Sequence, residues 1–191
     1  NWGFNHIRIP FHYKQFYNES ESDTPIGYEI IDELITWCEP YNMYIILDMH
    51  CAPGGQNGGP ISDSDGTARL WLEEENKALT IQIWSEIAGY YSEEELIGGY
   101  DLINEPVLPA GVSLEEFKQL YIDITDAIRE VDNNHIVYIE GNWYGTDFSG
   151  LTPPWDDNMS YSFHKYWGEY SLGTIQSYIS MSNQYDIPLW M

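Results

Sequence analysis

Basic residues are scarce in this sequence of 191 residues: 7 lysines and arginines face 31 aspartates and glutamates, for a formal net charge of -24. A nucleic-acid partner requires a basic surface, and a chain this acidic repels phosphates, so nucleic-acid binding is excluded. Because 43% of the residues are hydrophobic and 16% are aromatic, we expect a packed core despite the charge.

Long apolar runs and cysteines are also few. No run of 18 apolar residues occurs, so we expect neither a transmembrane helix nor a membrane partner. The chain opens on Asn1-Trp2-Gly3-Phe4 without a signal peptide, as if in the middle of a domain. Cys38 and Cys51 flank a predicted strand that spans ~25 Å. A disulfide between them is therefore not expected, and the compartment is not fixed by cysteine usage.

Apolar runs and turn residues divide the chain into alternating strands and helices. They predict six strands, over 4–11, 43–50, 97–105, 135–140, 159–164 and 187–191. They predict four helices, over 24–40, 70–91, 113–131 and 172–183. The connection 141–158 is too rich in glycine, proline and aspartate for a regular helix. This alternation indicates a parallel α/β fold, either an open doubly wound sheet or most of an eight-stranded barrel.

Polar residues stand at or near the ends of five predicted strands, and they favour the barrel. These residues are Arg8, His50, Asn104, Glu105, Glu140, His164 and Tyr166. In a barrel the carboxyl ends of all strands meet at one mouth, whereas in an open sheet they spread along an edge. We therefore predict an incomplete (β/α)8 TIM barrel, with residues 1–191 forming a single partial domain.

Glu105 is the most interesting of these residues, because Pro106 ends the strand directly after it. Burial at a strand tip raises a carboxyl pKa, which is what a general acid requires, although Glu105 could also simply begin a solvated loop. By the alternation of side chains along its strand, Arg8 faces the interior of the predicted fold, where a buried guanidinium group needs anionic partners. This arrangement of carboxyl groups fits glycoside hydrolysis, which uses two of them. Glu140 is the other glutamate at a clear strand end, as the second carboxylate or as a support residue.

Four motifs resemble, in this order, those of glycoside hydrolase family 5, the cellulase-like barrels. They are Ile7-Arg8-Ile9-Pro10, Leu47-Asp48-Met49-His50, Asn104-Glu105-Pro106 and His164-Lys165-Tyr166. The resemblance implies a (β/α)8 barrel, retention of configuration and no cofactor. It implies that Glu105 is the acid/base, that Arg8 orients the nucleophile and that Asn104 binds a sugar hydroxyl. His50, His164 and Tyr166 would line the subsite at the cleaved bond.

In that family the nucleophilic glutamate ends the strand after the His-x-Tyr strand, and here the sequence stops within that strand at Met191. By the resemblance, the chain holds about strands 2 to 7 of the barrel, with the nucleophile just beyond Met191. We therefore expect the 191-residue polypeptide alone to be inactive.

Several weaker signals remain. Trp143, Tyr144, Trp155 and Trp167 lie in loops after strand ends, as sugar platforms or as packing, and we place Trp143, Trp167 and Glu140 among the substrate-binding residues. The glycine-rich segment 54–59 lacks the Lys-Ser/Thr of a phosphate loop, so we expect a flexible wall of the cleft. The pattern around Asp63 and Asp65 fails as an EF-hand, although a looser surface cation stays open.

The sequence as a whole predicts a secreted, monomeric endo-β-1,4-glucanase without metal or cofactor, whose partner is a β-linked polysaccharide. Mannan, xylan-type or β-1,3-glucan substrates stay open, as does exo action. Two rivals remain. A metal-dependent hydrolase would usually show a His-x-His ligand pair, which this sequence lacks. A non-catalytic carbohydrate-binding barrel is the second.

Overall fold

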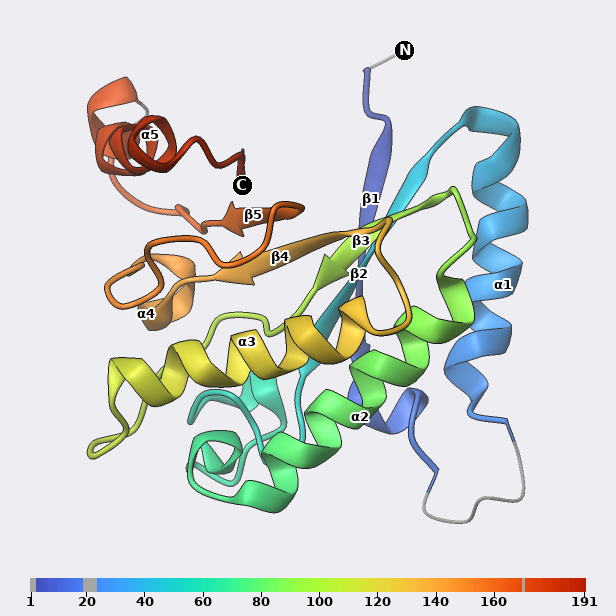
Figure 1. The fold of residues 1–191 in the computed structure, drawn as a ribbon, viewed down its shortest axis with the longest axis horizontal. Coiled ribbons are helices and arrows are strands. Elements are labelled where there is room, and N and C mark those ends of the chain that lie inside the picture. Colours follow the sequence, from blue (N-terminus) through green and yellow to red (C-terminus); the bar gives the residue numbers. More distant parts are fainter. Residues whose placement is uncertain (1–2, 19–23, 170) are drawn as a thin grey trace.

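A computed structural model describes residues 3–18, 24–169 and 171–191 and places six strands in one sheet (Figure 1). The strands are β1 (His6–His12), β2 (Tyr44–Cys51), β3 (Ile97–Asp101), β4 (Ile136–Glu140), β5 (Met159–Ser162) and β6 (Leu189–Trp190). Every neighbouring pair is parallel, and the spatial order β1-β2-β3-β4-β5-β6 follows the chain. A doubly wound sheet reverses its strand order at a switch point, and this sheet does not. It is therefore a part of a barrel wall, as predicted, while its equivalence to strands 2 to 7 stays a prediction.

The helices between the strands form the outer layer. They are α1 (Ile26–Cys38), α2 (Glu74–Tyr91), α3 (Leu114–Arg129), the short α4 (Asn142–Gly145) and α5 (Leu172–Tyr185). Single 3-10 turns occur at η1 (Tyr13–Gln15), η2 (Glu39–Tyr41), η3 (Pro60–Ser62) and η4 (Arg69–Trp71). In Figure 1, α1, α2 and α3 follow one another along the same side of the sheet. The apolar core fills the space between these helices and the outward side chains of the strands.

Helix α3 shows how the local sequence sets the elements. The Oγ atom of Ser113 accepts a hydrogen bond from the Glu116 backbone N–H at 3.1 Å, and the Glu116 carboxylate accepts from the Ser113 N–H at 2.8 Å. This reciprocal pair is a capping box. The apolar face of α3 is buried at Phe117, Leu120, Ile124 and Ile128. Val131, the last residue of the predicted helix, lies beyond the end of α3 and is exposed, so the helix is shorter than predicted.

Helix α1 packs onto the core along part of its apolar surface. Ile31 and Cys38 are buried and Leu34 and Ile35 pack partly buried against the core, whereas Ile26 and Ile30 are about half exposed. Gly27 packs directly onto η1, where a Cβ atom would lie 2.6 Å from the Gln15 carbonyl oxygen. Sequence periodicity cannot detect such a contact, since it comes from a glycine.

Other boundaries moved by a few residues. Helix α1 begins at Ile26 with Pro25 as its N-cap, and α2 begins at Glu74 because residues 69–71 form η4 instead. Strand β3 ends at Asp101 and β5 at Ser162, both shorter than predicted. The predicted irregularity of 141–158 is confirmed, since α4 is the only helix there.

The two cysteines, Cys38 and Cys51, are both free thiols, as expected from their separation. Within residues 3–18, 24–169 and 171–191, no helix combines the length and the apolar character that crossing a bilayer demands.

Candidate active site

Three carboxylates from three neighbouring strands surround the guanidinium group of Arg8 on the inner face of the sheet. Asp48 on β2 lies 2.9 Å from the Nη1 atom of Arg8, and Asp101 on β3 lies 2.8 Å from its Nε atom. Glu140 on β4 accepts a hydrogen bond from the Nη2 atom at 2.8 Å. All three carboxylates are fully buried. The prediction that Arg8 needs anionic partners is therefore confirmed.

This cluster carries more negative than positive charge, and its protonation reflects that. Burial raises the pKa of Asp101 to about 6, and Arg8 only partly offsets this effect. Burial also raises the pKa of Glu140 well above its usual range, and the Asp101 charge raises it further. Burial alone would lower the pKa of Arg8, but its three carboxylate neighbours raise it. Arg8 is thus always charged, and Asp101 and Glu140 hold a proton more tightly than ordinary carboxyl groups do.

Glu105 lies next to this cluster and is joined to it by His164. An oxygen of the Glu105 carboxylate lies 2.7 Å from the Nδ1 atom of His164, whose Nε2 atom lies 3.3 Å from Glu140. His164 follows the end of β5, whereas Glu105 follows the end of β3. The Glu105 side chain is 13% exposed, which leaves it the accessible carboxyl of this group. The chain of contacts from Arg8 through Glu140 and His164 to Glu105 ties together residues of four predicted strands.

The backbone of Glu105 adopts a left-handed conformation with φ of 47°, which is uncommon for a residue other than glycine. Its N–H donates to Glu140 at 2.7 Å. Glu140 therefore contacts Arg8, His164 and the Glu105 backbone, and none of its surface is exposed. This burial and these contacts favour the interpretation of Glu140 as a support residue over its predicted place among the substrate-binding residues, which stays a prediction.

Asn104 and His50 extend the cluster on either side. The Oδ1 atom of Asn104 accepts from Arg8 at 2.9 Å, while its buried Nδ2 atom has no hydrogen-bond partner within the described residues. The Nδ1 atom of His50 lies 2.7 Å from Asp48, which also binds Arg8. The predicted contact of Asn104 with a sugar hydroxyl stays a prediction.

The predicted aromatic residues lie at the surface of this region. Tyr166, Trp143 and Trp167 are 75%, 59% and 55% exposed. The ring centroid of Tyr166 lies 5.8 Å from that of His164, so this tyrosine borders the charged cluster. Trp155, in contrast, stacks against Tyr121 inside the helical layer, which favours packing over a sugar platform.

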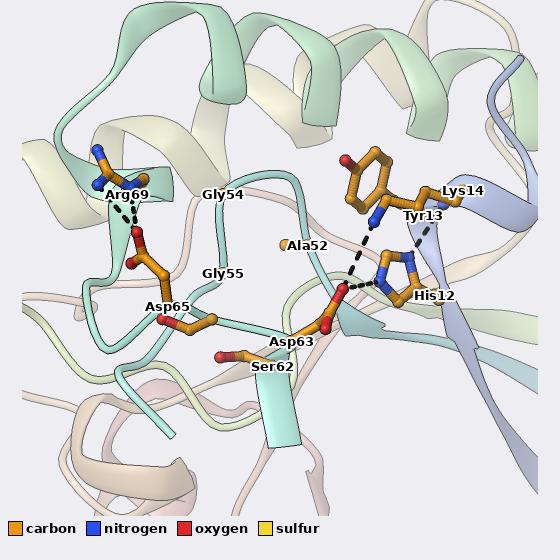
Figure 2. Close-up of a pocket in the computed structure, with 11 residues that line it drawn as sticks. His12, Tyr13, Lys14, Ala52, Gly54, Gly55, Ser62, Asp63, Asp65 and Arg69 are labelled. Carbon is orange, nitrogen blue, oxygen red and sulfur yellow. Dashed lines mark hydrogen bonds and ion pairs between the residues drawn. The ribbon is translucent and has the colours of Figure 1, made fainter. Parts of the chain in front are cut away.

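A polar pocket of about 200 Å³ opens at the carboxyl ends of β1 and β2 (Figure 2). On one side the Oδ2 atom of Asp63 lies 3.0 Å from the Nε2 atom of His12 and 3.5 Å from the Nζ atom of Lys14. On the other side Arg69 binds Asp65 at 2.9 Å. The two aspartates are thus neutralised by separate cations, and no group of three potential metal ligands occurs in the described part of the chain. The looser cation site finds no support here.

Sequence reasoning missed several residues that shape the site. Asp48 and Asp101 could have been assigned to the Arg8 cluster, because alternation along β2 and β3 places them on its face. The glycine-rich loop, predicted to be flexible, instead buries the side chains of Gln56 and Asn57. Each side chain also donates to a backbone carbonyl 48 residues away, Gln56 to that of Asn104 and Asn57 to that of Glu105, and no local pattern signals this.

A parallel barrel wall with carboxylates, a guanidinium group and an imidazole at the carboxyl ends of its strands defines a partial TIM barrel whose polar site lies at the mouth. A family model described as cellulase (glycosyl hydrolase family 5) matches residues 1–187. The chain belongs to glycosyl hydrolase family 5.

Individual relatives agree with this membership. The chain is 34% identical over 170 residues to a protein named beta-xylosidase from Phanerodontia chrysosporium, covering 86% of this chain and 35% of that protein. It is 31% identical over 172 residues to endoglucanase C of Acetivibrio thermocellus, covering 86% and 47%. It thus spans about a third to a half of the length of these relatives.

Solved structures support the fold. A Thermotoga maritima Cel5A structure in complex with cellobiose, in mutant form, superposes with a TM-score of 0.76 and covers 99% of this chain and 66% of that one. At 17% identity this likeness shows the shared fold alone.

Proposed function

We propose that the full-length polypeptide, meaning residues 1–191 with any adjoining natural sequence, is a retaining glycosidase that cleaves a β-1,4-glucan in the endo manner. The observation that carries this proposal is the placement of Glu105: a partly exposed carboxyl whose side chain contacts His164 and whose backbone N–H donates to the buried Glu140. The name of the Acetivibrio relative supports the substrate class. The name of the Phanerodontia relative favours a xylan-type substrate as the second candidate.

Glu105 would act as the general acid, donating its proton to the oxygen of the leaving sugar. Retention also requires a second carboxylate ~5–5.5 Å away, to attack the anomeric carbon. Asp48, Asp101 and Glu140 do not suit that role, because all three are fully buried. Their contacts with Arg8 instead suit them to hold the cluster in place.

The strand register supports a nucleophile located just after Met191. Strand β6 pairs with β5 so that Leu189 lies opposite Tyr161 and Trp190 opposite Ser162. If β6 continues in this register, the positions immediately after Met191 come alongside His164, which contacts Glu105. A carboxylate there would face the proposed acid across the cleaved bond.

The remaining properties follow from this reaction. Exposed rings of Trp143, Tyr166 and Trp167 would stack against sugar faces along the cleft. Two carboxylates suffice for the chemistry, so no cofactor is required. Because a polysaccharide stays outside the cell that digests it, we propose secretion, and we propose a monomer.

The test uses the full-length polypeptide with Glu105→Gln, and with Glu115→Gln at an exposed position of α3 as the matched control. Hydrolysis of β-1,4-glucan, xylan and β-1,3-glucan oligosaccharides is followed, and the anomer formed first is read by NMR. We expect the first variant to lose about 10²- to 10⁴-fold in kcat, the control to be unaffected, and the β-anomer to appear first.

Four outcomes would contradict the proposal. Glu105→Gln with nearly full activity would remove the acid, and an inverted product would remove the retaining mechanism. Oligosaccharide binding without cleavage by the full-length polypeptide would favour the carbohydrate-binding alternative. Turnover by residues 1–191 alone would refute the position of the nucleophile.

A further inference from the structure

The glycine-rich loop that follows β2 buries two side-chain amides, Gln56 and Asn57, neither of which has any exposed surface. A buried amide is costly unless its hydrogen-bonding groups are satisfied. Both side chains find their partners around the backbone that carries Glu105. This loop is therefore a built part of the site.

Gln56 joins the ends of two neighbouring strands. Its Nε2 atom donates to the backbone carbonyl of His50 at 2.7 Å and to that of Asn104 at 2.8 Å. Its Oε1 atom accepts from the N–H of Ala52 at 3.1 Å. Its own backbone carbonyl accepts from the N–H of Val107 at 3.0 Å. The segment 104–107 is thus bound to the loop on both sides of Glu105.

Asn57 contacts Glu105 itself. Its Nδ2 atom donates to the Glu105 carbonyl at 2.9 Å, and its Oδ1 atom accepts from the N–H of Gly59 at 2.9 Å. The hydroxyl of Ser62, which lines the pocket in Figure 2, donates to the Asn57 carbonyl at 2.7 Å. The orientation of the Asn57 amide is therefore fixed by the loop.

Glu105 needs this support because its backbone is left-handed, a conformation that persists only where the surroundings impose it. The peptide group before it is held by Glu140 on the N–H, and the peptide group after it is held by Asn57 on the carbonyl. These two groups set the direction of the Cα–Cβ bond. The position of the Glu105 carboxyl over the cleft follows from that direction.

We propose that Asn57, assisted by Gln56, is a positioning residue for the general acid Glu105. This inference rests on the proposed function. Asn57 is fully buried and cannot touch a sugar, so it acts only through Glu105. A general acid must lie within hydrogen-bond reach of the leaving oxygen, and a displacement near 1 Å can cost ~10²-fold in rate.

The chemistry of the leaving group supplies a test that a purely structural role would not pass. A sugar leaving group needs a proton from Glu105, whereas 2,4-dinitrophenolate departs without one. Loss of correct positioning therefore lowers kcat/KM for an oligosaccharide and spares kcat/KM for the dinitrophenyl glycoside. General damage to the fold lowers both to the same extent.

The experiment compares Asn57→Asp with the parent in the full-length polypeptide. This change keeps the shape and the acceptor for Gly59, but it replaces the donor to the Glu105 carbonyl by a carboxylate oxygen. Gln56→Glu, which removes the donor to the Asn104 carbonyl, is the second variant if the first does not fold. Asn158→Ala is the matched control, since its Nδ2 atom donates to the Asn134 carbonyl at 3.0 Å just before β5, away from the site.

We expect kcat/KM for the oligosaccharide to fall about 10- to 100-fold in Asn57→Asp, with kcat/KM for the dinitrophenyl glycoside within threefold of the parent. The control should change neither. Equal loss on both substrates, or no loss on either, overturns the positioning role. Glu105→Gln separates the two proposals: if it shows no dependence on the leaving group, the proposed function itself fails.

Discussion

Replacing Asp101 by asparagine tests the electrostatics of the buried cluster. The pKa of Asp101 in the folded chain is about 6, against an ordinary value of 3.8, chiefly because the carboxyl is completely buried. A difference of about two units, at 1.36 kcal/mol each, is worth about 3 kcal/mol of stability. Asparagine keeps the shape and an oxygen for Arg8 but cannot ionise.

The sign follows from proton linkage. The folded chain holds the Asp101 proton more tightly than the unfolded chain does, so the carboxyl favours the folded state most below about pH 4. This contribution is lost as the pH rises from about 4 to about 6, and it is constant above that range. The free energy of unfolding of Asp101→Asn, minus that of the parent, should therefore rise by about 3 kcal/mol across this window.

The assay is urea unfolding of the full-length polypeptide, followed by tryptophan fluorescence between pH 3 and pH 8. Asp156→Asn is the control, because hydrogen bonds from Arg129 lower the pKa of Asp156. The ionised Asp156 carboxylate stabilises the folded state above the pKa that it has in the unfolded chain, and this stabilisation is lost on further acidification. The free energy of unfolding of Asp156→Asn, minus that of the parent, should therefore change only below about pH 4. A difference for Asp101→Asn that is flat, or that falls as the pH rises, would mean that the Arg8 charge outweighs burial and would refute the reasoning.

Three further predictions concern stability and metal independence. Arg8→Met strands three buried carboxylates and should lower the free energy of unfolding by about 3–5 kcal/mol, and a loss below about 1 kcal/mol in urea unfolding would contradict the cluster. Gly99→Ala should lower the free energy of unfolding by about 1–3 kcal/mol, because the added Cβ atom would lie 2.3 Å from the Ile136 carbonyl oxygen. Gly89 is exposed on helix α2, so Gly89→Ala should raise the free energy of unfolding by about 0.5–1 kcal/mol in the same assay. Treatment with EDTA should leave hydrolysis unchanged, and a loss that Ca²⁺ or Zn²⁺ restores would revive the metal-dependent rival.

The strand-and-helix pattern and the inner face of the sheet could be predicted from the sequence because both depend on local periodicity. Alternation in β1 placed Arg8 opposite Ile7 and Ile9, and the cost of an unpaired buried charge then required carboxylates around it. The structure supplies them from β2, β3 and β4. The barrel was preferred over the open sheet because only a barrel brings the carboxyl ends of all strands together at one mouth.

The parts that could not be predicted depend on contacts between distant segments. Glu105 has a left-handed backbone, and its carbonyl accepts a hydrogen bond from Asn57, which lies 48 positions away in the sequence. Neither residue type indicates from sequence that the two are in contact. The close packing of Gly27 onto η1 is likewise invisible to an apolar pattern, because glycine carries no side chain. Glycine content also made the segment 54–59 look flexible, although it buries Gln56 and Asn57.

The buried charges around Arg8 indicate that this part of the sheet serves the function of the site more than the stability of the fold. Burying three carboxylates around one guanidinium is expensive, and apolar residues of similar size would often serve the fold at least as well. Two carboxylate oxygens, on Asp48 and Asp101, are buried without a hydrogen-bond partner in the described residues, which adds to the cost. Natural proteins accept such costs mainly where a site requires them. The cluster ends in the two partly exposed groups His50 and Glu105, so its charges are positioned to act on whatever occupies the mouth of the barrel.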